Sequence, residues 1–257
     1  MPLRVLVFGA HPDDAEFHAG GFLALHRARG SDVRMISVTD GSAGHQSMDR
    51  PTLAERRRLE ASRAAAVIGC AVEVWKNLDG ELEPTLAVRR DVIREIRRFK
   101  PDLVLTHRIH DYHPDHRAVA TLVRDACYMV RVPNIVPEAK ELPNDPIVAC
   151  FADFFSQPAP FRADAKVDVA PVIETWSRML DCHESQVYEW IPHTYGRGHE
   201  VPSDRTERLR WLPQFYPRPR GVARRFAPEL KLAEAFEISE YARKPTRDDM
   251  VRLFFAP

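Results

Sequence analysis

The sequence lacks the segments that would indicate a membrane-embedded, secreted or repetitive protein. It contains no apolar run approaching ~18 residues, the length that a membrane-spanning helix requires. It also has no internal repeat and no low-complexity tract. No basic segment followed by an apolar one opens the chain, so we expect no secretory signal and a cytoplasmic location. A membrane partner is therefore not expected.

An excess of charge of either sign is missing as well. The 37 Lys and Arg residues equal the 37 Asp and Glu residues, which gives a formal net charge of zero with histidines neutral. A balanced chain is not drawn as a whole to nucleic acid or to an anionic surface, although a local patch remains possible. We expect a small-molecule substrate and no nucleic-acid partner.

Cysteines are few, and two common catalytic motifs are absent. The four cysteines, Cys70, Cys127, Cys150 and Cys182, form no CxxC pair, so neither a thiolate metal site nor a disulfide framework is predicted. The turn after the first apolar run reads GAHPDD rather than GxGxxG, which argues against a nicotinamide cofactor. No GxSxG motif supports a serine hydrolase.

The first half of the chain alternates short apolar runs with helical patterns. The predicted strands cover residues 3–9, 33–38, 71–75 and 101–106, and the predicted helices cover residues 14–29, 53–68, 86–99 and 115–130. Four such repeats imply right-handed crossovers and a sheet that is covered on both faces. The sequence therefore predicts an α/β protein with a Rossmann-like three-layer fold and a mainly parallel central sheet.

The second half is less regular and carries many of the 21 prolines. We expect an irregular, loop-rich C-terminal part in which residues 132–160 and 191–229 form substrate or interface loops. Residues 147–155 are compatible with one more strand, and residues 172–183 with a helix. Residues 230–241 are expected to be helical or mixed with a short strand.

Two clusters of metal-binding side chains follow the first and the fourth predicted strands. One contains His11, Asp13 and Asp14, and the other runs from His113 to His116. Ligands of open α/β sheets bind beyond the carboxyl ends of the strands, so both clusters are expected in one crevice. Two histidines and one carboxylate suit catalytic zinc and leave a position for water, whose pKa drops to roughly 7.

This pattern predicts a hydrolytic metalloenzyme. A spare carboxylate would accept the proton of the water, and a spare histidine would donate to the developing oxyanion. One alternative is a solvated turn in which an aspartate caps a helix. Another is non-haem Fe(II), which takes the same ligand types. A free carboxylate beside the ligands favours hydrolysis over oxidation.

Several motifs together resemble those of the PIG-L/LmbE family, whose members are zinc enzymes that deacylate N-acetylglucosamine-type amides. The motifs are His11-Pro12-Asp13-Asp14-Ala15-Glu16 with Gly20-Gly21, Thr39-Asp40-Gly41, Arg57-Arg58-Leu59-Glu60, Leu78-Asp79-Gly80, His113-Pro114-Asp115-His116, His183-Glu184-Ser185-Gln186 and a weaker match at Ala233-Glu234-Ala235-Phe236. They span nearly the whole chain, and the resemblance implies a single LmbE-like deacetylase domain over residues 1–257.

The resemblance also implies roles for individual residues. It makes His11, Asp14 and His116 the ligands of one Zn²⁺ per chain. Fe²⁺ or another divalent metal remains possible at the same site. Asp13 becomes the general base and then the acid, and His113 the electrophile on the oxyanion side. Asp115 would hold His113 or His116 in the right tautomer. Arg57 would contact the substrate beside Asp40, or else lie on a solvated helix face.

The predicted reaction is hydrolysis of an N-acyl amide, preferably N-acetyl, on an amino sugar or its conjugate. An amidase of a thiol-sugar conjugate and a non-catalytic binding protein on the same scaffold remain as alternatives. His107 and His110 are expected at the surface rather than as further ligands. The arginines between residues 197 and 225 are expected to form a solvated basic loop, rather than to meet an anionic substrate group or a neighbouring subunit in a homo-oligomer.

Overall fold

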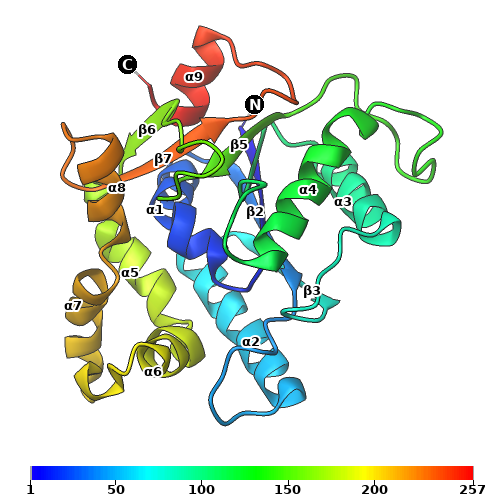
Figure 1. The fold of residues 1–257 in the computed structure, drawn as a ribbon. Helices are drawn as coiled ribbons and strands as arrows, with labels where there is room; N and C mark the ends of the chain where they lie inside the picture. Colours follow the sequence, from blue (N-terminus) through cyan, green and yellow to red (C-terminus); the bar gives the residue numbers. More distant parts are fainter. Residues whose placement is uncertain (1, 257) are drawn as a thin grey trace.

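Seven strands form one sheet in the order β3-β2-β1-β4-β5-β7-β6 in the computed structural model, which describes residues 2–256 (Figure 1). The strands are β1 (Arg4–Gly9), β2 (Asp32–Thr39), β3 (Ala71–Asn77), β4 (Leu103–Thr106), β5 (Ile147–Phe151), β6 (Ala165–Asp168) and β7 (Ala233–Ile238). Strands β1 to β5 pair in parallel, whereas β7 runs antiparallel to both β5 and β6. The predicted mainly parallel α/β sheet is confirmed.

Helices cover both faces of this sheet. Four of them connect the parallel strands: α1 (Asp14–Ala28), α2 (Arg50–Ile68), α3 (Leu86–Phe99) and α4 (Pro114–Met129). Helices α1 and α2 lie on one face together with α5 (Ile173–Asp181), while α3 and α4 lie on the other (Figure 1). No helix among residues 2–256 is long and apolar enough to cross a membrane.

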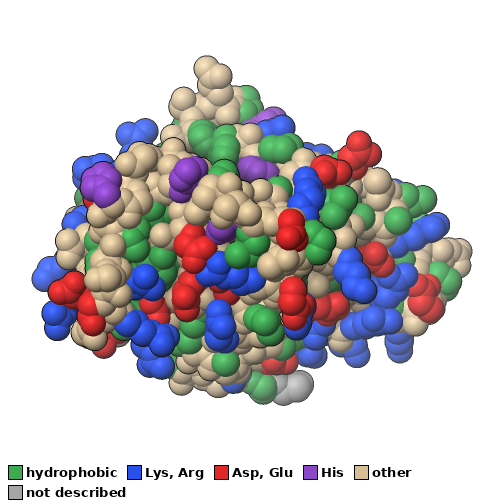
Figure 2. Space-filling model, turned by 90° about the horizontal axis from the view of Figure 1, so that it is seen from below, with side chains coloured by type: hydrophobic (Ala, Val, Ile, Leu, Met, Phe, Trp, Pro, Cys, Tyr) green, Lys and Arg blue, Asp and Glu red, His purple; other side chains and the backbone are tan. Residues whose placement is uncertain are grey.

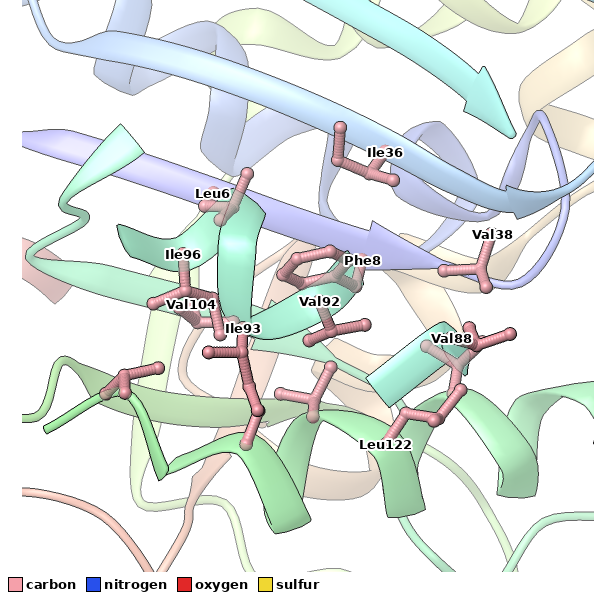
Figure 3. Packing of buried hydrophobic residues seen from close by; sticks show 14 of the residues in the cluster. Leu6, Phe8, Ile36, Val38, Val88, Val92, Ile93, Ile96, Val104 and Leu122 are labelled. Carbon is pink, nitrogen blue, oxygen red and sulfur yellow. The ribbon is translucent and has the colours of Figure 1, made fainter. Parts of the chain in front are cut away.

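The central strand β1 is buried on both faces and divides the core in two. Leu6 and Phe8 point toward α3 and α4, where they join Ile36 and Val92 (Figure 3). Val5 and Val7 point to the opposite side and pack with the apolar face of α1. Full burial of such side chains stabilises the fold by about 1.5–3 kcal/mol each. This two-sided burial explains why the strand reads as a continuous apolar run instead of an alternating one.

Local sequence signals set the ends of the connecting helices. The side chain of Asp49 accepts a hydrogen bond from the Thr52 N–H at the start of α2, and Gly69 ends that helix in the left-handed region. The side chain of His113 accepts from the Asp115 N–H at the start of α4. A histidine ring thus occupies the capping position where Ser, Thr or Asp is usual, which fixes its orientation.

The C-terminal part contains more regular structure than its prolines indicate. The segment expected to be irregular, residues 191–229, holds the helices α6 (Ile191–Thr194), α7 (Arg205–Phe215) and α8 (Arg218–Phe226). Prolines lie at the first or second position of α6 and α8, where a missing backbone N–H removes no hydrogen bond within the helix, and Pro213 lies within α7. A π-helical turn, Ser185–Trp190, precedes α6, and α9 (Arg247–Phe254) follows β7.

Residues 230–241 were expected to be at least partly helical, and the helical part of that prediction is wrong. Residues 233–238 form the antiparallel strand β7, which is inserted between β5 and β6. Ala233, Ala235 and Phe236 are fully buried there, so pairing and packing on both sides decide the conformation over local propensity.

Candidate metal centre

The turns after β1 and β4 bring the two predicted clusters together. β1 and β4 are neighbours in the sheet, so their carboxyl ends lie side by side. The ring centroids of His11 and His116 are 5.2 Å apart, and those of His11 and His113 are 4.6 Å apart. A Cβ on Gly9 would lie 2.9 Å from the Cβ of Asp14, so glycine is needed where the turn folds back.

These side chains line a cavity of about 650 Å³. Figure 2 shows the face toward which the carboxyl ends of the parallel strands point, with histidines among acidic and basic side chains. Much of the remaining lining is aromatic: Phe17, Tyr112, Phe154, Phe155, Trp190, Tyr195 and Tyr216. The cavity therefore combines a compact polar cluster with broad apolar walls, as small-molecule sites do.

The hydrogen bonds of His11 and His116 leave one lone pair free on each ring. The Nε2 of His11 faces two carboxylate oxygens, of Asp79 at 3.2 Å and of Asp115 at 3.3 Å, and therefore carries the proton. The Nδ1 of His116 likewise faces a carboxylate oxygen of Asp111 at 3.1 Å. The ring atoms left for a metal are then His11 Nδ1 and His116 Nε2.

Both free nitrogens face the carboxylate of Asp14. His11 Nδ1 lies 3.4 Å from one oxygen of Asp14, and His116 Nε2 lies 3.5 Å from the other. Ligand atoms bound to a tetrahedral zinc at 2.0–2.2 Å lie about 3.4 Å from one another. The donor types and these two distances thus suit a zinc ion. His11 and His116 share one group of possible ligands with His113, and Asp14 and His116 share another with His107, each with ligand atoms within 4.8 Å of one another.

The other two histidines near this group have no lone pair left for a metal. The Nδ1 of His113 accepts from the Asp115 N–H at 3.2 Å, so Nε2 carries the proton and acts as a donor. The Nε2 of His107 accepts from the Ala10 N–H at 3.2 Å, although it also lies 3.2 Å from Asp14. Proximity alone would include both residues as ligands, whereas their hydrogen bonds argue against it.

The charges around the cluster favour a bound cation. Burial acts to lower the pKa of His11, but its contacts with Asp115, Asp14 and Asp79 more than offset this and raise its pKa well above the usual range, so a metal bound at Nδ1 would take the place of a proton that these carboxylates hold there. Burial acts to raise the pKa of Asp14, but the imidazoles around it more than offset burial and hold its pKa well below the usual range. Burial, together with His11 and His116, lowers the pKa of His113, which is neutral at pH 7.

Asp13 and Arg57 form a buried ion pair at the cavity wall. Asp13 occupies the N-cap position of α1, yet its side chain does not cap the helix. Its Oδ1 lies 3.0 Å from Arg57, which also donates to the carbonyl oxygen of Gly41 at 3.1 Å. Arg57 is 2% exposed, so the alternative of a solvated helix face is wrong. Gly41 has a φ of +68°, and a Cβ there would press on the guanidinium.

Two predicted contacts need correction. Asp115 lies against His11, and also accepts from the N–H groups of Gly80 and Leu82, rather than holding His113 or His116 through its carboxylate. Its place at the start of α4 points the side chain back toward the turn after β3. Asp40 does not line the cavity, because its carboxylate accepts from the N–H groups of Ser42 and Asp79 and so joins two loops.

The sequence reasoning missed Asp79 and Asp111 and misplaced His107. Asp79 and Asp111 hold the rings of His11 and His116. Asp79 lies within the motif Leu78-Asp79-Gly80, to which no role was given, and Asp111 lies two residues before His113. His107 is 2% exposed rather than at the surface, and its ring stacks on that of His116 with centroids 4.0 Å apart. Its position directly after β4 was the available signal. His110 is exposed, as expected.

Comparison with known proteins finds a family model that matches the part of the chain carrying both clusters. The family model for PIG-L, described as GlcNAc-PI de-N-acetylase, matches residues 6–127. Diacetylchitobiose deacetylase of Thermococcus kodakarensis is 29% identical over 232 residues, which is 83% of this chain and 84% of that protein. 4-Oxalmesaconate hydratase of Pseudomonas putida is 27% identical over 200 residues, or 74% of this chain and 76% of that protein.

The fold has a counterpart among solved structures. The N,N'-diacetylchitobiose deacetylase of Pyrococcus horikoshii superposes with a TM-score of 0.71 at 23% identity, covering 95% of this chain and 88% of that one. At this identity the likeness supports the fold only. The match of the PIG-L family model to residues 6–127, together with the 29% identity to diacetylchitobiose deacetylase, confirms the predicted resemblance to the PIG-L/LmbE family.

Proposed function

We propose that this protein is a metal-dependent N-deacetylase that hydrolyses the N-acetyl amide of an amino sugar or its conjugate. One observation carries the proposal: two free imidazole lone pairs and the Asp14 carboxylate converge beside Asp13 in a substrate-sized cavity. The similarity to diacetylchitobiose deacetylase supports the same reaction class.

Three side chains would hold one divalent cation, Zn²⁺ in our proposal: His11 through Nδ1, His116 through Nε2, and Asp14. When bound, zinc lowers the pKa of a water molecule from 15.7 to roughly 7 and polarises a carbonyl group. Asp79 and Asp115 orient His11, and Asp111 orients His116, which are the supporting contacts that such ligands need.

Asp13 is the proposed general base. One of its oxygens is held by Arg57, the other has no hydrogen-bond partner among residues 2–256, and Asp13 is part of the cavity lining. Asp13 takes a proton from the attacking water and returns it to the amide nitrogen as the C–N bond breaks. A positioned base of this kind contributes on the order of 10²–10⁴-fold to the rate.

His113 is the proposed donor to the oxyanion. Because its Nδ1 accepts a backbone N–H, its Nε2–H is fixed as a donor before substrate arrives. Negative charge that develops on the carbonyl oxygen strengthens this hydrogen bond in the transition state. The low pKa that burial and the neighbouring imidazoles give His113 keeps it neutral, so it donates without transferring its proton.

The aromatic walls of the cavity are proposed to hold the sugar ring. Phe154 comes from the predicted 132–160 loop, while Tyr195 and Tyr216 come from the 191–229 segment. Since the cluster and its walls take residues from both halves of the chain, we propose that residues 1–257 work as one deacetylase domain.

Hydration of a carbon–carbon double bond is a second candidate. It is favoured by the 27% identity to 4-oxalmesaconate hydratase, and it requires the same kind of activated water. In that reaction Asp13 would again take the proton of the water and pass it to carbon.

Acetate release from a panel of N-acetylglucosamine derivatives, including a thiol conjugate, tests the proposal. We expect turnover that a chelator abolishes and Zn²⁺ restores, and metal analysis of the purified protein separates zinc from iron. Asp13→Asn should lower kcat by about 10²–10⁴-fold with zinc retained, whereas Asp91→Asn, at an exposed position on α3, should keep wild-type activity.

Absence of acetate from the zinc-loaded protein, together with consumption of an unsaturated tricarboxylate, would establish the hydratase instead. If His116→Ala leaves tight sugar binding intact and the wild type turns over neither substrate class, the protein is a binding protein.

A further inference from the structure

One arginine lines the cavity without an ion-pair partner among residues 2–256. Arg218, at the start of α8, donates through Nη2 to the Nδ1 of His18 at 2.6 Å and to the carbonyl oxygen of Ala152. The other arginine in the lining, Arg57, is paired with Asp13 at 3.0 Å. Arg218 therefore offers a charge to the cavity that no carboxylate of the described chain neutralises at contact distance.

The acidic groups around Arg218 already have other partners. Asp153 is paired with Arg108 at 3.1 Å. Asp111 accepts from His116. Glu234 accepts the N–H groups of Gly21 and Phe22 at 2.9 and 2.7 Å. These carboxylates attract Arg218 only across longer distances. The Nε and Nη1 donors of the guanidinium are therefore without an acceptor among residues 2–256.

The position of Arg218 is fixed by its neighbours. The ring of His18 stacks on Phe151, with centroids 5.0 Å apart and planes inclined by 24°. Burial and the nearby guanidinium hold the pKa of His18 well below its usual range, so Nδ1 is a neutral acceptor. Arg218 also lies over the ring of Phe154 at 5.9 Å. By contrast, Arg220 on the same helix is exposed.

One layer of side chains separates this guanidinium from the candidate metal centre. The ring centroid of His18, which Arg218 contacts, lies 6.4 Å from that of His116 and 5.6 Å from that of His107. A group bound by Arg218 would therefore belong to the part of a substrate close to the scissile amide.

We infer that Arg218 binds a carboxylate of the substrate, so that the cavity selects amides carrying a negative charge on the sugar or on the acyl group. A half-buried cation without a counter-ion is costly, and a ligand carboxylate supplies the missing partner. A guanidinium matches a carboxylate in charge and planar shape. This inference rests on the proposed function of the cavity as a reaction site.

Three probes with matched variants test the inference. N-acetylglucosamine is neutral, N-acetylmuramic acid carries a carboxylate on the sugar, and N-succinylglucosamine carries one on the acyl group. In the zinc-loaded protein, Arg218→Gln should lower kcat/KM for one anionic probe by about 10- to 100-fold. It should change the value for N-acetylglucosamine by less than about twofold, and Arg220→Gln should change neither. The probe that is affected identifies which side of the amide Arg218 contacts.

Binding gives a second readout that does not depend on turnover. Trp190 lines the cavity, so dissociation constants of the probes are measurable by tryptophan fluorescence. If no probe is hydrolysed but Arg218→Gln selectively weakens an anionic one, the deacetylase proposal fails and the carboxylate site stands. Equal effects on neutral and anionic probes, or a wild type that binds no anionic probe more tightly than N-acetylglucosamine, would overturn the inference. Should Arg218→Gln fail to fold, Arg218→Lys replaces it: because the charge stays and the planar donor is lost, we expect a smaller loss that is still confined to the anionic probe, and an equal effect on both probe classes would overturn the inference.

Discussion

Replacing Asp111 by alanine should weaken metal binding without removing a proposed ligand. Asp111 accepts the Nδ1 proton of His116 at 3.1 Å, and this contact leaves the Nε2 lone pair pointing to Asp14. Burial acts to raise the pKa of Asp111, but the hydrogen bond from His116 more than offsets it, so the carboxylate is ionised at neutral pH. In Asp111→Ala the ring is free to take the other tautomer or to turn.

Loss of such a supporting carboxylate typically costs 10- to 100-fold in metal affinity, which corresponds to about 1.4–2.8 kcal/mol. A competition titration of Zn²⁺ against a chromophoric chelator measures this change directly. Asp111→Asn should lie between the wild type and the alanine variant, because the amide oxygen still accepts the same proton. Asp91→Ala, an exposed aspartate on α3, is the control. An unchanged zinc affinity in Asp111→Ala would refute the assignment of His116 Nε2 as a ligand fixed by Asp111.

Three further changes test other parts of the structure. His113→Ala should lower kcat by about 10²–10³-fold with the zinc content unchanged, as measured by steady-state kinetics and metal analysis, because the proposed oxyanion donor is lost while the proposed metal ligands are kept. Arg97→Met should lower the free energy of unfolding, measured in urea, by about 3–5 kcal/mol, because the buried guanidinium donates hydrogen bonds to carbonyl oxygens of residues 129–139. The control Arg98→Met, at an exposed position, should change the free energy of unfolding by less than about 0.5 kcal/mol. His26→Gln should remove a pH dependence of the free energy of unfolding. Burial lowers the pKa of His26 from 6.5 to about 4 in the folded protein, so the unfolded chain binds a proton at a higher pH than the folded one. The free energy of unfolding of the wild type should therefore fall by about 3 kcal/mol between pH 6.5 and 4. The variant should show a flatter stability curve over that window, whereas exposed His199→Gln should follow the wild type.

The parallel half of the fold could be predicted from the sequence because its signals are local. Apolar runs such as residues 3–9 end at a polar turn, and helix ends such as Gly69 carry their own conformational preference. The C-terminal half lacks such signals. Strand β7 is specified by its insertion between β5 and β6, and the short helices after residue 190 by what they pack against. Long-range pairing of this kind leaves little trace in a single segment.

The arginines of residues 197–225 show a similar limit. As a sequence pattern they form one basic stretch, and a solvated loop was the expected state. In the folded protein these arginines have different environments. Arg197 pairs with Glu200, Arg220 is exposed, and Arg218 lines the cavity and donates a hydrogen bond to His18. Only the partner of each guanidinium distinguishes a surface charge from a substrate contact, and that partner lies about 200 residues away in the case of His18.

Four histidines around Asp14 illustrate why residue type and spacing predict a metal site but not its ligands. His11, His107, His113 and His116 are close enough to serve, and each offers the same imidazole. What separates them is the partner of a ring nitrogen. Carboxylates at one nitrogen free the other nitrogen of His11 and His116, whereas backbone N–H groups occupy the lone pairs of His107 and His113. Asp79 and Asp111, rather than the histidines themselves, therefore decide which imidazoles are available to a cation.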